Sequence, residues 1–286
     1  MDQPYRLLKK ANPGQRQEDL PNIIERKTMR SYRHSGTLGD LIYSLSIVKK
    51  MAVDNNAVFL VALNNIENCV AQYGYRPEEV DPAHKGRFTY QDYEWLKPLL
   101  NRQSYIHYSG TWTQGTPEPD VDLDRFRGTL FRGFEGNYVQ AYHIAFGLPF
   151  TMADYDTPWL EADPIKTKPI VVSRTFRYRS TEPAATASHM QMAQDADLEN
   201  NGIFVGTYAE HEDYVKATGV NIAYRPVKDF LELAGIVAGA DMVVANQNFV
   251  YSLAMGLGVS TVLETIKIKP LQQNECFFPR KNCQYF

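Results

Sequence analysis

The stretch from Met242 to Glu264 constrains the fold of this chain more than any other part of the sequence. It opens with the apolar run 242–245, which is typical of a parallel strand covered on both faces. A short polar loop follows, and then a helix of small residues, a glycine stop and another strand. Because the carboxyl ends of parallel strands form the ligand crevice of an open α/β sheet, we expect a phosphorylated small molecule at this loop. The residues that we expect to face it are Asn246, Gln247, Asn248, Tyr251 and Ser252.

A glycine turn near the N-terminus also lies between a predicted strand and a predicted helix. The pattern predicts a strand over 29–35, then the turn residues Gly36, Thr37 and Gly39, then a helix that Asp40 opens. Asp40 has two open interpretations: an acidic residue favoured by the helix dipole, or a general base at the crevice. His34, just before the turn, is either a hydrogen-bonded structural histidine or a residue on the acceptor side.

Residues 150–168 form a proline-containing segment with several acids, which we interpret as a linker between domains. After it a second series of alternating predicted strands and helices begins. The apolar run 170–172 predicts a strand, and a loop rich in arginines and hydroxyls follows it. Arginine forks match phosphate oxygens, so the loop is either a solvated basic segment or an anion site, and its place after a buried strand favours the latter. The residues concerned are Ser173, Arg174, Arg177 and Arg179.

These signals predict an α/β chain with two facing Rossmann-like domains. We expect an N-terminal arm over 1–27, a first domain over 28–160 that holds the acceptor and a second over 161–270 that holds the donor. Residues 271–286 are expected to pack back on the first domain.

Composition and spacing exclude several classes of protein. The net charge of −3 provides no overall basic field for nucleic acid, and no apolar run is long enough for a transmembrane segment. The start of the chain lacks a signal peptide, and three sparse cysteines are typical of a reducing compartment, so we expect a cytoplasmic protein. The six histidines show no metal-binding spacing, and we expect neither a metal nor a cofactor.

Two segments resemble a known family. The sequence Gly39-Asp40-Leu41-Ile42 is similar to the first-loop motif of the ADP-heptose:lipopolysaccharide heptosyltransferase family of GT-B glycosyltransferases. Residues 230–246, followed by 252–261, resemble the donor motif in the second domain of that family. The chain is short for the family and differs from its motif: Gln247, Asn248 and Phe249 replace an acidic residue and a Ser/Thr-Gly step. The motif histidine is replaced by Tyr251 or Ser252, and the motif proline by Ser260.

The resemblance implies a metal-independent glycosyltransferase of the hexosyl, heptosyl or pentosyl type that acts with inversion. Asp40 would be the general base on the acceptor hydroxyl, the arginine loop would hold the diphosphate, and residues 246–249 would face the nucleotide-sugar donor. The acceptor stays open among a glycan, a lipid-linked glycan, a protein, a small molecule and a nucleic-acid base. Two other functions also stay open: a non-catalytic protein that binds nucleotide or glycan, and a nucleotide-sugar epimerase or hydrolase.

Overall fold

The computed structural model describes residues 29–52, 55–63, 88–113, 116–130, 134, 136–176, 178–179, 183–265 and 276–286. The predicted N-terminal arm and Arg177 lie outside these residues. The described residues form two compact units: those up to 37 with 48–125, and 38–47 with those from 126 onward. In place of one boundary near residue 160, residues 38–47 and 126–160 belong with the second unit.

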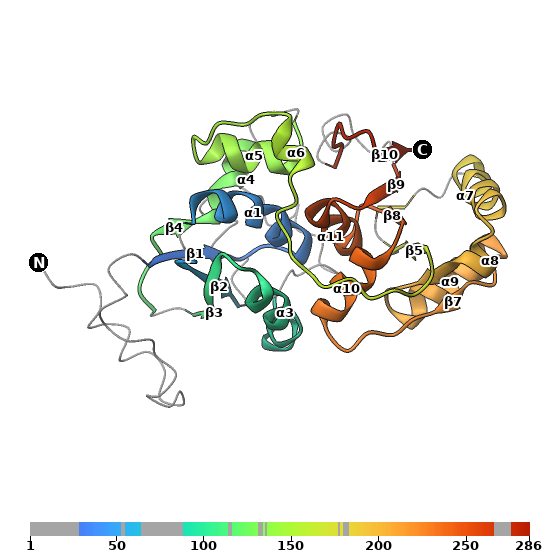
Figure 1. Ribbon diagram of the computed structural model, residues 1–286, viewed down its shortest axis with the longest axis horizontal. Helices are drawn as coiled ribbons and strands as arrows, with labels where there is room; N and C mark the ends of the chain where they lie inside the picture. The colour runs from blue at the N-terminus through green and yellow to red at the C-terminus, as the bar shows by residue number, and fades with distance from the viewer. Residues whose placement is uncertain are drawn as a thin grey trace, which may run out of the picture. The chain divides into compact units, whose positions relative to one another are not determined.

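The first unit is built on a four-stranded parallel sheet with the order β3-β2-β1-β4 (Figure 1). Its elements are β1 (Arg30–His34), β2 (Ala57–Ala62), α3 (Tyr90–Arg102), β3 (Ile106–Trp112), β4 (Val121–Asp122) and the 3-10 turn η6 (Leu123–Arg125). Helix α3 starts at a capping box, in which Thr89 and Asp92 satisfy each other's backbone N–H groups, and buries Leu96, Leu99 and Leu100. Helix α1 (Leu38–Met51) leaves β1, and its first ten residues belong to the second unit.

The second unit is built on a six-stranded parallel sheet with the order β10-β9-β8-β5-β6-β7. Strands and helices alternate, as parallel neighbours require, because each return to the same end of the sheet needs a crossover. The order reverses at β5, which leads to β6 and β7 on one side, whereas β8 and β9 lie on the other. The elements are α4 (Phe126–Leu130), α5 (Tyr138–Ala145), α6 (Ala153–Asp156), β5 (Ile170–Ser173), α7 (Pro183–Asp195), α8 (Leu198–Asn201), β6 (Gly202–Phe204), α9 (Tyr208–Thr218), β7 (Ala223–Tyr224), α10 (Phe230–Gly239), β8 (Met242–Asn246), α11 (Phe249–Leu257), β9 (Ser260–Glu264) and β10 (Cys283–Tyr285).

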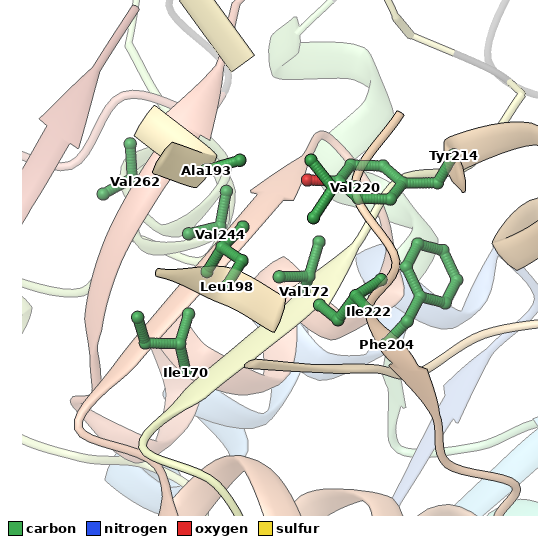
Figure 2. Packing of buried hydrophobic residues seen from close by; sticks show 10 residues of the cluster. All are labelled: Ile170, Val172, Ala193, Leu198, Phe204, Tyr214, Val220, Ile222, Val244 and Val262. Carbon is green, nitrogen blue, oxygen red and sulfur yellow. The ribbon is translucent and has the colours of Figure 1, made fainter. Parts of the chain in front are cut away.

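One face of the second sheet carries the hydrophobic cluster in Figure 2. Ile170 and Val172 of β5 lie two residues apart and so point to the same face, where Val244 of β8 and Phe204 of β6 are the register neighbours of Val172. Helices α7, α8 and α9 contribute Ala193, Leu198 and Tyr214 to the cluster. Helices α10 and α11, which pack against each other, are buried nearly all round.

The sequence predicted this architecture of two parallel Rossmann-like sheets, and the structure confirms it. Strand β3 runs through Trp112, because residues 110–112 pair in register with β2. The expected linker over 150–168 contains α6, and its residues 157–168, here called the strap, pack on the second unit. In the strap, Trp159 and Leu160 donate their backbone N–H groups to the Gly256 carbonyl.

The C-terminal residues form β10, which joins the edge of the second sheet beside β9. Residues 276–278 also contact Tyr43, Asn137 and Tyr155, which the sequence placed in the first domain and which belong to the second compact unit. No helix of the described residues has the length and apolar character needed to cross a membrane.

The strap over α10 generates a stability prediction. A Cβ atom added at Gly239 would lie 2.2 Å from the backbone oxygen of Ile165, which cannot move aside as a side-chain end could. We expect Gly239→Ala to lower the free energy of unfolding by about 1–3 kcal/mol through overpacking. Urea unfolding followed by circular dichroism measures this change.

Gly128 in α4 is the matched control, because a Cβ there meets nothing within 4 Å. Gly128→Ala should be neutral or stabilising by up to about 1 kcal/mol. Equal stability of the two variants would contradict the close packing of the strap on α10.

Candidate functional site

The polar residues expected at the donor side lie where the second sheet reverses its strand order. Strands β5 and β8 are neighbours, and Ser173 pairs in register with Ala245, so both strands end at the same edge. The loop after β5 and the turn from β8 into α11 therefore meet there. In open α/β sheets this is the position of the ligand crevice.

Two asparagine amides join the loop to the turn. The Asn246 amide donates to the carbonyls of Thr175 and Tyr178 at 3.0 and 3.2 Å, and its oxygen accepts from the Thr175 N–H at 3.1 Å. The Asn248 amide donates to the Ser173 carbonyl and to the Asn246 oxygen, and its own oxygen caps α11 at the Tyr251 N–H. These side chains thus fix the backbone of the crevice edge instead of pointing donors into it.

Gln247 differs from its two neighbours. Its side chain is half-buried, and it forms no hydrogen bond in the described part of the chain. The other two predicted contacts face inward: Tyr251 is buried and donates its hydroxyl to the Cys276 carbonyl at 2.7 Å, and Ser252 donates to the Phe249 carbonyl. Burial also raises the pKa of Tyr251 well above its usual value. Of this loop, Gln247 is the residue available to a ligand.

Arg174 lies in a buried ion pair. Its Nε and Nη2 donate to the two carboxylate oxygens of Glu264 at 2.7 and 2.8 Å, and His189 Nε2 lies 3.0 Å from the same carboxylate. Burial favours a raised pKa for Glu264, but the hydrogen bonds from Arg174 and His189 outweigh it and lower the pKa to about 2. The guanidinium predicted for the diphosphate therefore joins β5 to β9.

Arg179 is also paired within the second unit. It forms an ion pair with Asp213 of α9, and its guanidinium lies 5.3 Å from the ring centre of the exposed Phe176. Of the three predicted phosphate-binding arginines, the two in the described residues thus contact carboxylates. Sequence reasoning missed both acids, although Glu264 at the end of an apolar strand was a signal for a buried partner.

Asp40 lies in the first turn of α1. Arg127 Nη2 donates to its Oδ2 at 3.1 Å, and the Tyr142 hydroxyl donates to its backbone carbonyl at 3.0 Å. The Asp40 side chain is 13% exposed, and in the described part of the chain no group is hydrogen-bonded to Oδ1. A fixed carboxylate with one uncommitted oxygen can accept a proton from a bound hydroxyl. Sequence reasoning did not identify Arg127 as the partner of Asp40.

The glycine turn at the start of α1 lies near α11. A Cβ at Gly39 would lie 3.9 Å from the Ser252 hydroxyl of α11, so the first turn of α1 approaches α11 closely within the second unit. His34 is buried, and its Nδ1 accepts from the Gly36 N–H at 2.9 Å, which agrees with the structural interpretation of this histidine. Thr37 is the N-cap residue of α1 without a capping hydrogen bond from its side chain.

Within the described residues, no group of three or more His, Cys, Asp or Glu side chains is arranged to hold a metal ion. The metal-independent reaction that the sequence predicts stays a prediction.

No protein-family model and no curated protein sequence matches this chain. Its fold, however, is similar to solved structures. A family 9 glycosyltransferase from Veillonella parvula DSM 2008 matches with a TM-score of 0.54 and 10% sequence identity, over 91% of this chain and 86% of the other. The Escherichia coli heptosyltransferase WaaC with ADP-2-deoxy-2-fluoro heptose matches with a TM-score of 0.45 and 12% identity, over 90% and 92% of the two chains. The E. coli ADP-heptose lipopolysaccharide heptosyltransferase II gives 0.43 and 10%, over 90% of each chain.

At such identities the likeness shows the fold. The chain has the α/β architecture of the V. parvula glycosyltransferase, in agreement with the GT-B fold predicted from the sequence.

The buried Glu264 generates a pH prediction. Its pKa is about 2 in the folded protein and near 4.5 in the absence of partners, so its stabilisation is complete above pH 4.5 and is lost as the pH falls towards 2. A shift of this size corresponds to about 3 kcal/mol. We expect Glu264→Gln to lower the free energy of unfolding at neutral pH by about 3–5 kcal/mol, because Arg174 loses its buried counter-charge.

Urea unfolding at several pH values measures both effects. The difference between wild type and Glu264→Gln should shrink as the pH falls below 4.5. Glu212→Gln, at an exposed position of α9, should leave the stability unchanged throughout. A difference that does not vary with pH would show that Glu264 contributes through packing alone.

Proposed function

We propose that the protein is a glycosyltransferase that moves a sugar from a nucleotide-diphosphate sugar to an acceptor hydroxyl, with inversion and with Asp40 as the general base. The observation that carries the proposal is the Asp40 carboxylate, which Arg127 fixes through Oδ2 while Oδ1 accepts no hydrogen bond in the described residues. The fold shared with the V. parvula glycosyltransferase supports it as an analogy of architecture.

The proposed reaction is a displacement at the anomeric carbon. Asp40 Oδ1 takes the proton of the acceptor hydroxyl, the acceptor oxygen attacks the anomeric carbon, and the bond to the nucleotide diphosphate breaks on the opposite face. Inversion follows from this single displacement. Arg127 has a positioning role, because its contact with Oδ2 orients the carboxylate.

The leaving diphosphate needs positive charge or N–H donors. Residues of the described chain that can supply them are the Gln247 amide and the N-terminus of the nine-residue helix α11, which follows the strand end. Arg177 stays a further candidate outside the described residues. In this proposal Arg174 and Arg179 act indirectly, since their ion pairs hold the loop after β5 in place.

A second candidate is a non-catalytic protein that binds a nucleotide or a glycan. The internal hydrogen bonds of Asn246 and Asn248 favour it, because they remove polar groups that a donor site would use. A nucleotide-sugar epimerase or hydrolase would instead form a product sugar without any acceptor.

Nucleotide release from UDP-, GDP- and ADP-sugars, with and without acceptor extracts, tests these candidates. We expect acceptor-dependent release by the wild type and a 10²–10⁴-fold lower kcat for Asp40→Asn, about the contribution of a general base, with the nucleotide affinity retained. Asp195→Asn, at the exposed end of α7, is the matched control and should keep full activity.

Nucleotide binding without turnover by the wild type would favour the non-catalytic protein. Sugar released equally with and without acceptor would favour the epimerase or hydrolase. Full activity of Asp40→Asn would remove Asp40 from the mechanism.

The role of Arg127 has its own test. We expect Arg127→Met to lower kcat by about 10-fold or more with little change in KM for the donor, because the base would lose its orientation and not its substrate. Arg127→Lys should restore part of the activity, since it can still donate one hydrogen bond to Oδ2. Equal losses in Arg127→Met and Arg127→Lys, accompanied by a lower melting temperature, would assign Arg127 a purely structural role.

A further inference from the structure

The first turn of α1, which carries Asp40, is contacted by side chains from two other helices. Thr37, the N-cap residue of α1, forms no capping hydrogen bond with its side chain. The first N–H groups of a helix have no partner within it, so a helix start without such a cap depends on other contacts for its position. In this chain α4 and α5 of the second unit supply them, one to the side chain of Asp40 and one to its main chain.

Tyr142 of α5 contacts the main chain of Asp40. Its hydroxyl donates to the Asp40 carbonyl at 3.0 Å, and the Tyr142 side chain is fully buried. In an α-helix the same carbonyl is the acceptor for the N–H of the residue four positions later, here residue 44. Tyr142 thus adds a second hydrogen bond to this carbonyl and fixes the backbone that carries the Asp40 carboxylate.

Arg127 of α4 contacts the side chain of Asp40, and Phe126 connects Arg127 with Tyr142. Arg127 Nη2 donates to Asp40 Oδ2 at 3.1 Å. The rings of Phe126 and Tyr142 are stacked, with their centres 4.1 Å apart and their planes at 19°. The Arg127 guanidinium lies 4.8 Å from the centre of the Phe126 ring. The four residues therefore form a closed cycle of contacts that begins and ends at Asp40.

Each member of this cycle limits the movement of the next. The Phe126 ring is fully buried and lies against the Tyr142 ring, so close packing restricts both rings. A guanidinium is attracted to the face of an aromatic ring, and Phe126 thereby orients Arg127. Because its main chain and one carboxylate oxygen are both held, the Asp40 side chain has few alternative orientations.

We propose that Tyr142 is a positioning residue for the sugar transfer. Its hydroxyl, and through Phe126 and Arg127 its ring, hold the Asp40 carboxylate in the orientation that a general base needs. The inference rests on the proposed function of Asp40. A general base must lie within hydrogen-bond reach of the proton that it takes, and a small displacement lowers the rate steeply. Tyr142 acts through Asp40 and itself transfers no proton.

Tyr142→Phe tests the role of the hydroxyl, because it removes one O–H group and keeps the ring that stacks on Phe126. We expect the kcat of acceptor-dependent transfer to fall about 5- to 10-fold, as for the loss of one hydrogen bond, with the KM for the donor changed by less than about twofold. Steady-state nucleotide release measures both constants. A wild-type kcat in Tyr142→Phe would overturn the proposal.

Tyr93→Phe is the matched control. The Tyr93 hydroxyl is buried in the first unit and donates to the Ser109 carbonyl at 2.9 Å, so the control loses the same kind of hydrogen bond at another place. It should keep the wild-type kcat. An equal fall of kcat in Tyr93→Phe and Tyr142→Phe would show a general effect of losing a buried hydroxyl and would contradict the positioning role.

The double variant with Asp40→Asn and Tyr142→Phe separates positioning from other effects on the rate. If Tyr142 acts through Asp40, adding Tyr142→Phe to Asp40→Asn should change kcat by less than about twofold, because effects of residues that act as a unit do not add. A further 5- to 10-fold loss in that background would overturn the proposal. Full activity of Asp40→Asn alone would instead refute the proposed function, so the two failures are distinguishable.

Hydrogen exchange followed by mass spectrometry tests the same contact without any substrate. We expect peptides that cover the first half of α1, residues 38–47, to exchange several-fold faster in Tyr142→Phe than in the wild type, and no faster in Tyr93→Phe. Unchanged exchange in Tyr142→Phe would show that the hydroxyl does not hold the first turn, and would overturn the proposal whether or not transfer is observed. Faster exchange with an unchanged kcat would limit Tyr142 to a structural role.

Discussion

The two carboxylate oxygens of Glu264 accept hydrogen bonds from the guanidinium of Arg174. This buried ion pair holds together the edge of the second sheet at which the proposed site lies. It connects the end of β5 to the end of β9 across β8. Asn246 and Asn248 then attach the loop after β5 to the turn before α11. All six strands are parallel, so their carboxyl ends, and with them these polar groups, gather at one edge. Hydrogen bonds within the second unit therefore hold the backbone of this edge in place.

Three charged side chains that the sequence assigned to the site form ion pairs within the second unit. Arg174 and Arg179 follow β5, where free guanidinium groups would suit a diphosphate, but they contact Glu264 and Asp213. Asp40 forms an ion pair with Arg127 through Oδ2, and its Oδ1 accepts no hydrogen bond in the described residues. Arg280 is the contrast among the described arginines, since its buried terminal nitrogens have no partner.

Much of the fold could be predicted from the sequence, because periodicity and glycine stops are local signals. The run 242–245 is apolar on both faces and became β8, and the small residues after it became α11. The site was less predictable, because it depends on partners far apart in the chain. Asp40 and Arg127 are 87 residues apart, and Arg174 and Glu264 are 90 apart. Nothing in the local pattern around Arg174 distinguishes a phosphate ligand from half of a buried ion pair. The C-terminal strand β10 was missed for a similar reason, since its three residues become a strand only through pairing with β9.

Helix α1 is continuous in the chain but divided between the compact units, with residues 38–47 in the second and the remainder in the first. Leu41, Ile42 and Leu45 are fully buried, and the Trp159 indole donates to the Ile42 carbonyl at 2.9 Å. A fragment that starts in the strap before β5 would therefore expose the surface that these side chains cover. Because its residues come from two separate stretches of the chain, the second unit cannot be obtained by cutting the chain once.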